Sequence, residues 1–116
     1  MKEFILALDQ GTSSSRALLY DNSGKTISMS QQAIEMSHPK DGWVEQDPNE
    51  IWDSVLAAGR EAITSSGIDP KFIKGIGITN QRETTLVWNK KTGQCVYNAI
   101  VWQDRRTITT CIEMDS

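Results

Sequence analysis

Eight consecutive residues near the amino terminus carry the side chains best suited to chemistry. They are Asp9, Gln10, Gly11, Thr12, Ser13, Ser14, Ser15 and Arg16. A glycine lets the backbone turn sharply and bring its N–H groups close to an anion. Hydroxyl groups donate hydrogen bonds to phosphate oxygens, and an arginine adds a permanent charge in a fork that matches phosphate. The segment is therefore typical of a loop that binds the phosphates of a nucleotide.

Asp9 predicts a metal ion at the same place. A carboxylate beside a polyphosphate would repel it unless a cation lay between them. Mg²⁺ is held in proteins by one or two carboxylates together with phosphate oxygens and water. We therefore expect Asp9 to help hold Mg²⁺, and the hydroxyls at 12–15 and Arg16 to face phosphate.

The same residues also fit a simpler role, as the turn of a β-hairpin between the apolar runs at 4–8 and 17–20. Asp, Gly, Thr and Ser are common turn residues. A hairpin turn needs roughly two to five residues, and a run of hydroxyls closed by a cation exceeds that need. The loop is not of the Walker type, because Leu19 stands where a glycine is required five positions before Gly24.

Length and charge limit the classes of protein that remain. The chain has 116 residues, a net charge of −3 and a hydrophobic share of 38%. No basic block outweighs the acids, which argues against nucleic acid as a partner. No apolar run is long enough to span a membrane, and the start is too short for a secretory signal, so we expect a cytoplasmic protein. Cys95 and Cys111, with His38 as the one histidine, argue against a zinc site and favour reduced thiols.

Hydrophobic spacing predicts three strands, a helix, a further strand with a hairpin appended, and a final helix. The helix has Asp47 as its cap and Pro48 at its first position, and it ends at Gly67. Its apolar face is expected to include Trp52 in the core. The expected strands are 4–8, 17–20, 26–33, a buried strand at 73–79 with close backbone neighbours, 84–88 and 98–101. Residues 36–46 are expected to be irregular, 89–93 to form a turn, and Asp104 to cap a final helix.

This order predicts an α/β fold with the mixed sheet of ribonuclease H-like proteins. Three strands joined by hairpins and followed by a helix and a strand form the opening of that sheet. Asp9 then lies at the carboxyl end of the first strand, where ligands of open α/β sheets gather. One more strand and helix would complete the layer, so we expect an incomplete first domain from a longer protein.

A second polar segment follows the strand at 73–79. Arg82 and Glu83 are neighbours, and they can share a site only if the chain leaves strand geometry there. Together they offer fixed donors and acceptors, which suit the adjacent hydroxyls of a polyol. The alternative is a surface ion pair that contributes little stability. Trp102 has two possible roles as well: it could lie against the carbons of a small polyol or cover the core.

Four segments together resemble the FGGY carbohydrate kinases, of the actin-like ATPase superfamily. They are residues 7–16, 42–48, 77–85 and 98–107. The acidic-Gly-Thr loop and the Trp-x-Asp-x-Arg pattern are shared across that family, whereas residues 80–85 resemble its glycerol kinase branch. The likeness runs nearly end to end, so residues 1–116 resemble the amino-terminal part of the family's N-terminal domain.

The resemblance implies a role for several residues and two substrates, ATP and glycerol. Asp9 would help hold Mg²⁺, and the nucleotide phosphates would be approached by Thr12, Ser13, Ser14 and Arg16. Thr12 would also touch the phosphate of the product. Glycerol hydroxyls would be bound by Arg82 and Glu83, with Trp102 as an apolar wall.

The implied reaction transfers the γ-phosphoryl group of ATP to glycerol, giving sn-glycerol 3-phosphate and ADP. The family's general base and most of its adenine pocket lie farther along the chain, so we expect no catalytic base within these residues and no useful activity from them alone. The resemblance also implies a homo-oligomer. The alternatives are another FGGY sugar kinase and a non-catalytic sensor of polyols or nucleotides. A two-metal nuclease is a weak alternative, because 79–81 offers no carboxylate.

Overall fold

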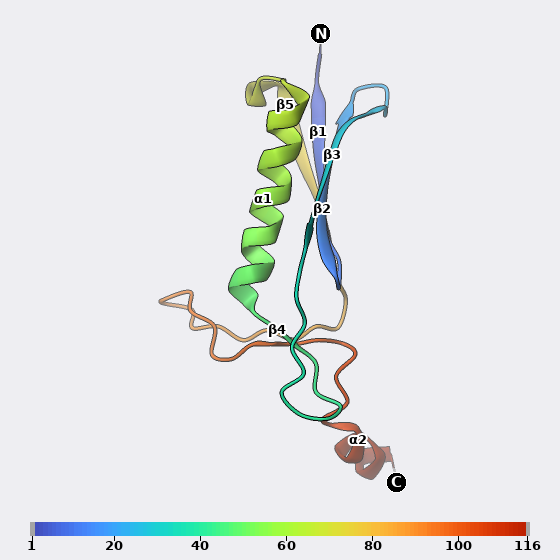
Figure 1. The fold of residues 1–116 in the computed structure, drawn as a ribbon, viewed down its shortest axis with the longest axis vertical. Coiled ribbons are helices and arrows are strands. Elements are labelled where there is room, and N and C mark those ends of the chain that lie inside the picture. The colour runs from blue at the N-terminus through green and yellow to red at the C-terminus, as the bar shows by residue number, and fades with distance from the viewer. Residues whose placement is uncertain (1, 116) are drawn as a thin grey trace. The chain divides into compact units, whose positions relative to one another are not determined.

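The computed structural model describes residues 2–115, and the chain divides into two compact units (Figure 1). The first unit contains the residues up to Ile34 together with Asn49–Gln81. The second contains Glu35–Pro48 together with the residues from Arg82 onward. The strands of the first unit form a four-stranded sheet, and the second unit has a two-stranded sheet.

The first unit has the mixed sheet that the sequence predicts. Its strands are β1 (Phe4–Gln10), β2 (Ser14–Asp21), β3 (Thr26–Ala33) and β5 (Ile73–Asn80), in the order β3-β2-β1-β5. β1, β2 and β3 form an antiparallel meander, and β5 is parallel to β1. Helix α1 (Pro48–Ser66) and the short 3₁₀ helix η1 (Pro70–Phe72) lie between β3 and β5 in the sequence. The short strand β4 (Glu45–Gln46), which belongs to the second unit, comes before α1. The ribonuclease H-like prediction is confirmed.

The core of this unit lies between α1 and one face of the sheet. Alternate residues of β1 and β2 supply its large side chains, and α1 supplies small ones, because successive strand residues point to opposite faces. The buried cluster consists of Phe4, Leu6, Ala17, Leu19, Ala58 and Ala62. A Cβ atom added to Gly59 would meet Leu8 Cδ2 at 3.5 Å, so the helix packs closely on β1.

Helix α1 begins and ends where the sequence predicts. Pro48 is its first residue, and Gly67 follows its last with a φ of 73°, a left-handed conformation that glycine adopts without strain. The prediction that Trp52 lies in the core is wrong, because its side chain is 61% exposed. The buried residues of α1 are Ser54, Ala58, Gly59 and Ala62. Trp52 precedes Ser54 by two positions, which turns it about 200° away from that face.

The prediction that β5 is a buried strand with close backbone neighbours is also wrong. Ile76 and Ile78 are 61% and 73% exposed, and nothing lies within 4 Å of a Cβ added to Gly75 or Gly77. β5 is the edge strand of the sheet as far as residues 2–115 define it. Helix α1 packs on β1 and β2 and reaches β3 through hydrogen bonds from Ser30 and Gln32 to Glu61. Ile73 at the start of β5 packs against this core, whereas Ile76 and Ile78 stay exposed.

The second unit is built on a two-stranded antiparallel sheet. β4 (Glu45–Gln46) pairs with β6 (Ala99–Ile100). The strand expected at 98–101 is confirmed as β6, whereas the expectation that 36–46 is irregular is wrong where β4 forms. The side chains of Glu45, Gln46 and Ala99 are buried in this pair. Each strand has only two residues, which is too short for an alternating apolar pattern to show in the sequence.

A hairpin precedes β6, although the strand expected at 84–88 is reduced to isolated bridges. Thr85 pairs with Ile100, and Trp88 pairs with Cys95. The expected turn at 89–93 is confirmed, because the Gly93 N–H donates to Asn89 O at 2.8 Å. Cys95 and Cys111 are free thiols, as predicted.

The final helix, α2 (Ile108–Asp115), begins later than the sequence predicts. Asp104 does not cap it. The Asp104 carboxylate instead accepts hydrogen bonds from the backbone N–H of Val44 and from Arg106, which draw it away from the helix. None of the helices between residues 2 and 115 is long and apolar enough to cross a membrane.

Candidate functional site

The predicted phosphate loop is the tip of a β-hairpin. Gly11, Thr12 and Ser13 connect β1 to β2, and the Gly11 N–H donates to Ser14 O at 2.8 Å. A Cβ added to Gly11 would lie 3.0 Å from that same oxygen, so the close turn depends on glycine. The geometry is thus the hairpin turn that the sequence left as an alternative, with Thr12 and Ser13 at its tip and Ser14 and Ser15 at the start of β2.

Asp9 and Arg16 are brought face to face by the pairing of β1 with β2. They are direct cross-strand partners, and Thr79 of β5 is the partner of Asp9 on the other side. Both charged residues are exposed. They lie on the sheet face opposite α1, because Asp9 alternates with the buried Leu6 and Arg16 alternates with the buried Ala17.

This arrangement fits a magnesium ion that takes most of its ligands from phosphate and water. Asp9 is an open carboxylate two residues before Gly11, where the hairpin tip begins. Among residues 2–115, no three His, Cys, Asp or Glu side chains gather as they would around a metal held by protein alone. One open carboxylate is compatible with Mg²⁺, which usually keeps several waters and takes its other ligands from phosphate.

Ser14 and Ser15 have different surroundings. Ser14 Oγ accepts a hydrogen bond of 2.8 Å from Gln31 on the face that carries Arg16. Ser15 is 1% exposed, and its Oγ lies 2.7 Å from Ser54 Oγ of α1. The expectation that the Ser15 hydroxyl faces phosphate is therefore wrong, because strand alternation turns it into the core.

Gln10 was not among the predicted site residues, yet it holds the hairpin tip. Its side chain is buried, and its Nε2 donates to Gly11 O at 2.7 Å. Its Oε1 accepts from Gln81 Nε2 at 3.3 Å, which links the tip to the residue that follows β5. Gln10 shares the face of Phe4, Leu6 and Leu8, so the two-residue period of β1 is the signal that could have found it.

The second predicted segment leaves strand geometry at the required point. β5 ends at Asn80, and Glu83 has a φ of 61°, in the left-handed region that residues other than glycine rarely adopt. The condition for Arg82 and Glu83 to share a site is thereby met. Both side chains are exposed, as is Trp102 at 52%, so the alternative that Trp102 covers the core is wrong.

The second unit brings Trp102 to this segment. The Trp102 N–H donates to Thr84 Oγ1 at 3.3 Å, and Thr85 and Ile100 exchange backbone hydrogen bonds of 2.9 and 3.0 Å. The structure thus places the backbone of Trp102 beside Thr84, the residue that follows Arg82 and Glu83. Asp9, Thr12, Ser13, Ser14 and Arg16 are in the first unit, so their sharing of one cleft with the polyol residues stays a prediction.

A buried charged cluster supports the backbone after Trp102. Arg106 donates to Asp104 at 2.8 to 3.0 Å and to Glu45 Oε2 at 2.7 Å. Its guanidinium also lies 3.8 Å from the centre of the Trp43 ring. The side chains of Glu45, Asp104 and Arg106 are 2%, 3% and 14% exposed. Sequence reasoning missed this cluster, because Glu45 lies 61 positions before Arg106 in the chain.

The cluster shifts the pKa of each acid in it. Hydrogen bonds from the Arg106 guanidinium, with smaller ones from two backbone N–H groups, lower the pKa of Asp104 to about 2. Burial raises the pKa of Glu45, but hydrogen bonds from Tyr97, Arg106 and Asn98 outweigh it, so the pKa of Glu45 lies below its ordinary value. Both carboxylates are therefore charged at neutral pH.

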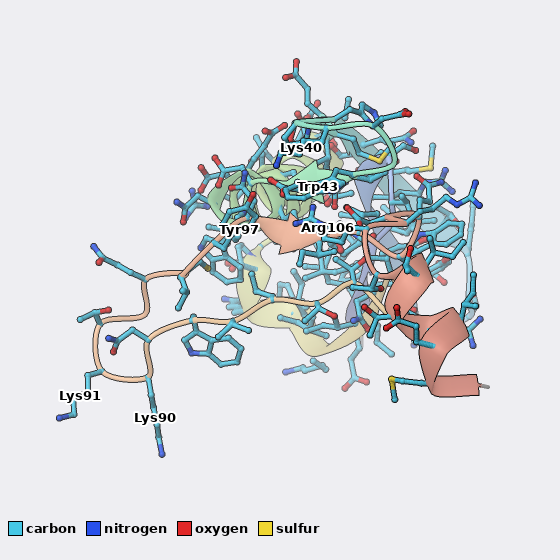
Figure 2. All side chains as sticks on the ribbon, turned by 90° about the horizontal axis from the view of Figure 1, so that it is seen from below. Lys40, Trp43, Lys90, Lys91, Tyr97 and Arg106 are labelled. Carbon is cyan, nitrogen blue, oxygen red and sulfur yellow. The ribbon has the colours of Figure 1, made fainter. Side chains whose placement is uncertain are left out.

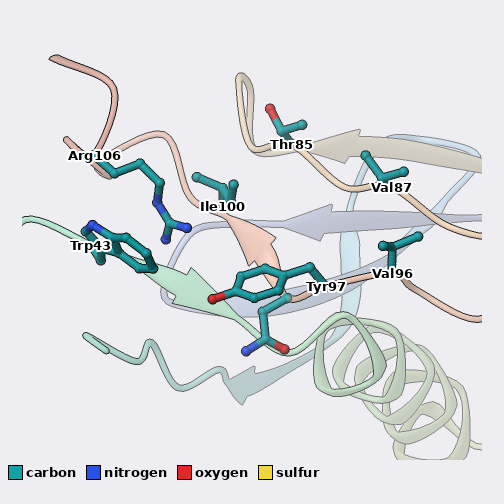
Figure 3. Close-up of a pocket in the computed structure, with 8 residues that line it drawn as sticks. Trp43, Thr85, Val87, Val96, Tyr97, Ile100 and Arg106 are labelled. Carbon is teal, nitrogen blue, oxygen red and sulfur yellow. The ribbon is translucent and has the colours of Figure 1, made fainter. Parts of the chain in front are cut away.

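A shallow apolar pocket of about 460 Å³ lies beside this cluster in the second unit (Figure 3). Trp43, Arg106, Tyr97 and Ile100 line it, together with Val87 and Val96 of the hairpin. Figure 2 shows Lys90 and Lys91 at the tip of that hairpin, pointing away from Tyr97. None of the predicted site residues lines this pocket, so it is separate from the candidate polyol residues.

Comparison with known proteins places the chain among kinases. The FGGY family of carbohydrate kinases, N-terminal domain, matches residues 4–116. Glycerol kinase of Chromobacterium violaceum is 54% identical over 112 residues, which are 97% of this chain and 22% of that protein. Glycerol kinase of Burkholderia cenocepacia is 56% identical over 94% of this chain and 22% of its own length. The chain thus spans about a fifth of the length of these relatives.

Solved structures give the same result for the fold. The crystal structure of Plasmodium falciparum glycerol kinase with ADP has a TM-score of 0.86 at 34% identity, covering 97% of this chain and 23% of that one. Xylulose kinase from Rhodospirillum rubrum has a TM-score of 0.90 at 25% identity, with the same coverage of 97% and 23%. The match of the family over nearly all of the sequence, together with this fold, shows that the chain belongs to the FGGY family of carbohydrate kinases.

Proposed function

We propose that the protein containing this chain is a glycerol kinase, which transfers the γ-phosphoryl group of ATP to glycerol and gives sn-glycerol 3-phosphate and ADP. The observation that carries the proposal is the 54% identity to a glycerol kinase over 97% of the chain. The segment at 80–85, which resembles the glycerol kinase branch more narrowly than the wider family, supports glycerol over a pentose. The proposal includes a cytoplasmic, homo-oligomeric enzyme.

On the nucleotide side, the first unit would bind the phosphates of ATP. Thr12 and Ser13 at the hairpin tip would donate to phosphate oxygens, together with Ser14 and Arg16 on the open face of β2. Thr12 would also touch the phosphate of the product. Asp9 would hold Mg²⁺, which when bound neutralises charge on the phosphates. The direct pairing of Asp9 with Arg16 supports this assignment.

On the glycerol side, the second unit would supply the polyol contacts. The Arg82 guanidinium would donate to glycerol oxygens, and the Glu83 carboxylate would accept from its hydroxyls. The exposed ring of Trp102 would cover the carbon atoms. The bond from Trp102 to Thr84 supports this grouping, because it ties the ring to the segment that carries both charges.

These residues bind and align the substrates but include no general base. Phosphoryl transfer depends mostly on positioning and on neutralising charge, which are the tasks that the named residues are suited to perform. We propose that the base that accepts the proton of the glycerol hydroxyl lies outside residues 2–115. The 116-residue chain alone should therefore show no glycerol-dependent turnover.

An assay of ADP release tests the proposal on the full-length product of the gene. We expect MgATP turnover with glycerol, and little with xylulose or gluconate. Turnover on one of those sugars instead would indicate a different FGGY kinase. Binding of glycerol or MgATP by calorimetry without turnover would indicate a sensor, and either result would overturn the proposal. Glycerol-dependent turnover by the 116-residue chain alone would contradict the placement of the base.

A further inference from the structure

We propose that Thr84 is a positioning residue for the glycerol pocket, because its hydroxyl ties the Arg82–Glu83 segment to Trp102. The inference rests on the proposed function, which places these residues around glycerol. Thr84 would act through its two neighbours in space and would not bind glycerol itself. Thr84 lies in the segment at 80–85, but the sequence alone assigns it no role of its own.

The hydrogen bond that carries the inference joins two distant parts of the second unit. The Trp102 N–H donates to Thr84 Oγ1 at 3.3 Å across 18 positions of sequence. The next link along the chain is the pair of backbone bonds between Thr85 and Ile100. Of these links, the bond to Thr84 is therefore the one nearest to Glu83 in the sequence.

The backbone around Trp102 is fixed on its other side. Val101 is 1% exposed, and its N–H donates to Val44 O at 3.0 Å. The Asp104 N–H donates to Val101 O at 2.8 Å, and Asp104 itself belongs to the buried charged cluster. The backbone on both sides of Trp102 is thus held by hydrogen bonds, and the Thr84 hydroxyl is bonded to Trp102 itself.

Glu83 needs support of this kind. Its φ of 61° is unfavourable for a residue with a Cβ, and such a conformation persists only where the surroundings hold it. The Arg82 and Glu83 side chains are exposed and supply little packing, whereas Thr84 is half-buried. The Thr84 hydroxyl is therefore suited to keep Glu83 in this conformation before glycerol binds.

Two substitutions separate the hydroxyl from the shape of the side chain. Thr84→Val keeps the branched shape and removes the acceptor, whereas Thr84→Ser keeps the acceptor. In the full-length protein, we expect Thr84→Val to raise the KM for glycerol about three- to tenfold, with kcat and the KM for MgATP within about twofold. Thr84→Ser should restore the KM for glycerol to near the parent value.

Thr92→Val is the matched control. Thr92 Oγ1 accepts a hydrogen bond of 3.2 Å from the Gln94 N–H in the hairpin turn, away from the predicted glycerol residues. The Thr92→Val variant loses a hydrogen bond of the same kind, from a backbone N–H to a threonine hydroxyl, and its KM for glycerol should stay unchanged. A readout that does not need turnover is the amide of Trp102, whose hydrogen exchange should become faster in Thr84→Val and not in Thr84→Ser.

The outcomes distinguish this inference from the proposed function. If the parent protein phosphorylates glycerol and Thr84→Val binds glycerol as tightly as the parent, Thr84 has no positioning role and the proposed function stands. An equal rise in the KM for glycerol and for MgATP would show general damage and would also overturn the inference. A parent protein that neither binds nor phosphorylates glycerol would overturn both.

Discussion

At the scale of single residues, the hydroxyls of the hairpin divide into two groups. Ser14 lies on the open face with Arg16, whereas Ser15 is buried against Ser54 of α1. The division follows from the alternation of side chains along β2. Residues that look equivalent in the sequence therefore have separate tasks, since one group is open to a ligand and the other holds the helix on the sheet.

Gly11 lies where the hairpin tip leaves little room for a side chain. In Gly11→Ala the new Cβ would lie 3.0 Å from Ser14 O, so the turn must open. We expect the free energy of unfolding to fall by about 1–3 kcal/mol, as for other overpacked sites, and the KM for MgATP to rise in the full-length protein. Gly75→Ala is the control, because open space surrounds its Cβ position. Equal effects of the two substitutions on denaturant unfolding would contradict the account of the turn.

At the scale of elements, the sequence predicted those whose signals are local. The bounds of β3 and α1 follow from alternation, from Pro48 and from Gly67. β4 could not be predicted, because Glu45 is buried only where Arg106 of a distant segment neutralises it. The exposure of β5 could not be predicted either, since its apolar residues reveal nothing about which strands α1 covers.

The packing of α1 on β2 depends on the buried pair of Ser15 and Ser54. Ser54→Ala leaves the Ser15 hydroxyl buried without this partner, which should cost about 1–3 kcal/mol of unfolding free energy. Ser65→Ala is the matched control, because the bond of 2.9 Å between Ser28 and Ser65 is exposed and should contribute little. The double variant Ser15→Ala with Ser54→Ala should recover part of the loss. A loss in Ser65→Ala as large as that in Ser54→Ala, measured by urea unfolding, would contradict this view.

The charged cluster predicts how the second unit responds to acid. The pKa of Asp104 is lowered from 3.8 to about 2, so the folded state binds its proton less readily than the unfolded state. The stability that this provides is present above pH 3.8 and is lost as pH falls toward about 2. Glu45, whose pKa is also lowered, adds a loss of the same sign.

Fluorescence of Trp43, which contacts Arg106, can follow this unfolding, with the other three tryptophans replaced by phenylalanine. The denaturant midpoint should fall steeply below pH 4 in that background. In Asp104→Asn it should be lower at neutral pH and depend less on pH. A midpoint that is the same at pH 6 and pH 2.5 would show that the cluster does not stabilise this unit.

At the scale of the whole molecule, the two groups of predicted residues belong to different units. Asp9, the hydroxyls of the hairpin and Arg16 lie in the first unit, and the candidate polyol residues lie in the second. Sequence reasoning found both groups from their residue types, because charged and hydroxyl side chains cluster in short segments beside apolar runs. It gave no separate role to Gln10 or Thr84, whose polar side chains bond to partners far along the chain.

The central claim is that the hairpin handles the nucleotide and the segment after β5 handles glycerol. The most direct test compares Arg16→Gln with Arg82→Gln in the full-length protein, by the kinetics of glycerol-dependent ADP release. We expect Arg16→Gln to raise the KM for MgATP about tenfold or more and to leave the KM for glycerol within about twofold, and Arg82→Gln to do the reverse. A parent protein without turnover on glycerol, or two variants impaired toward the same substrate, would contradict the account.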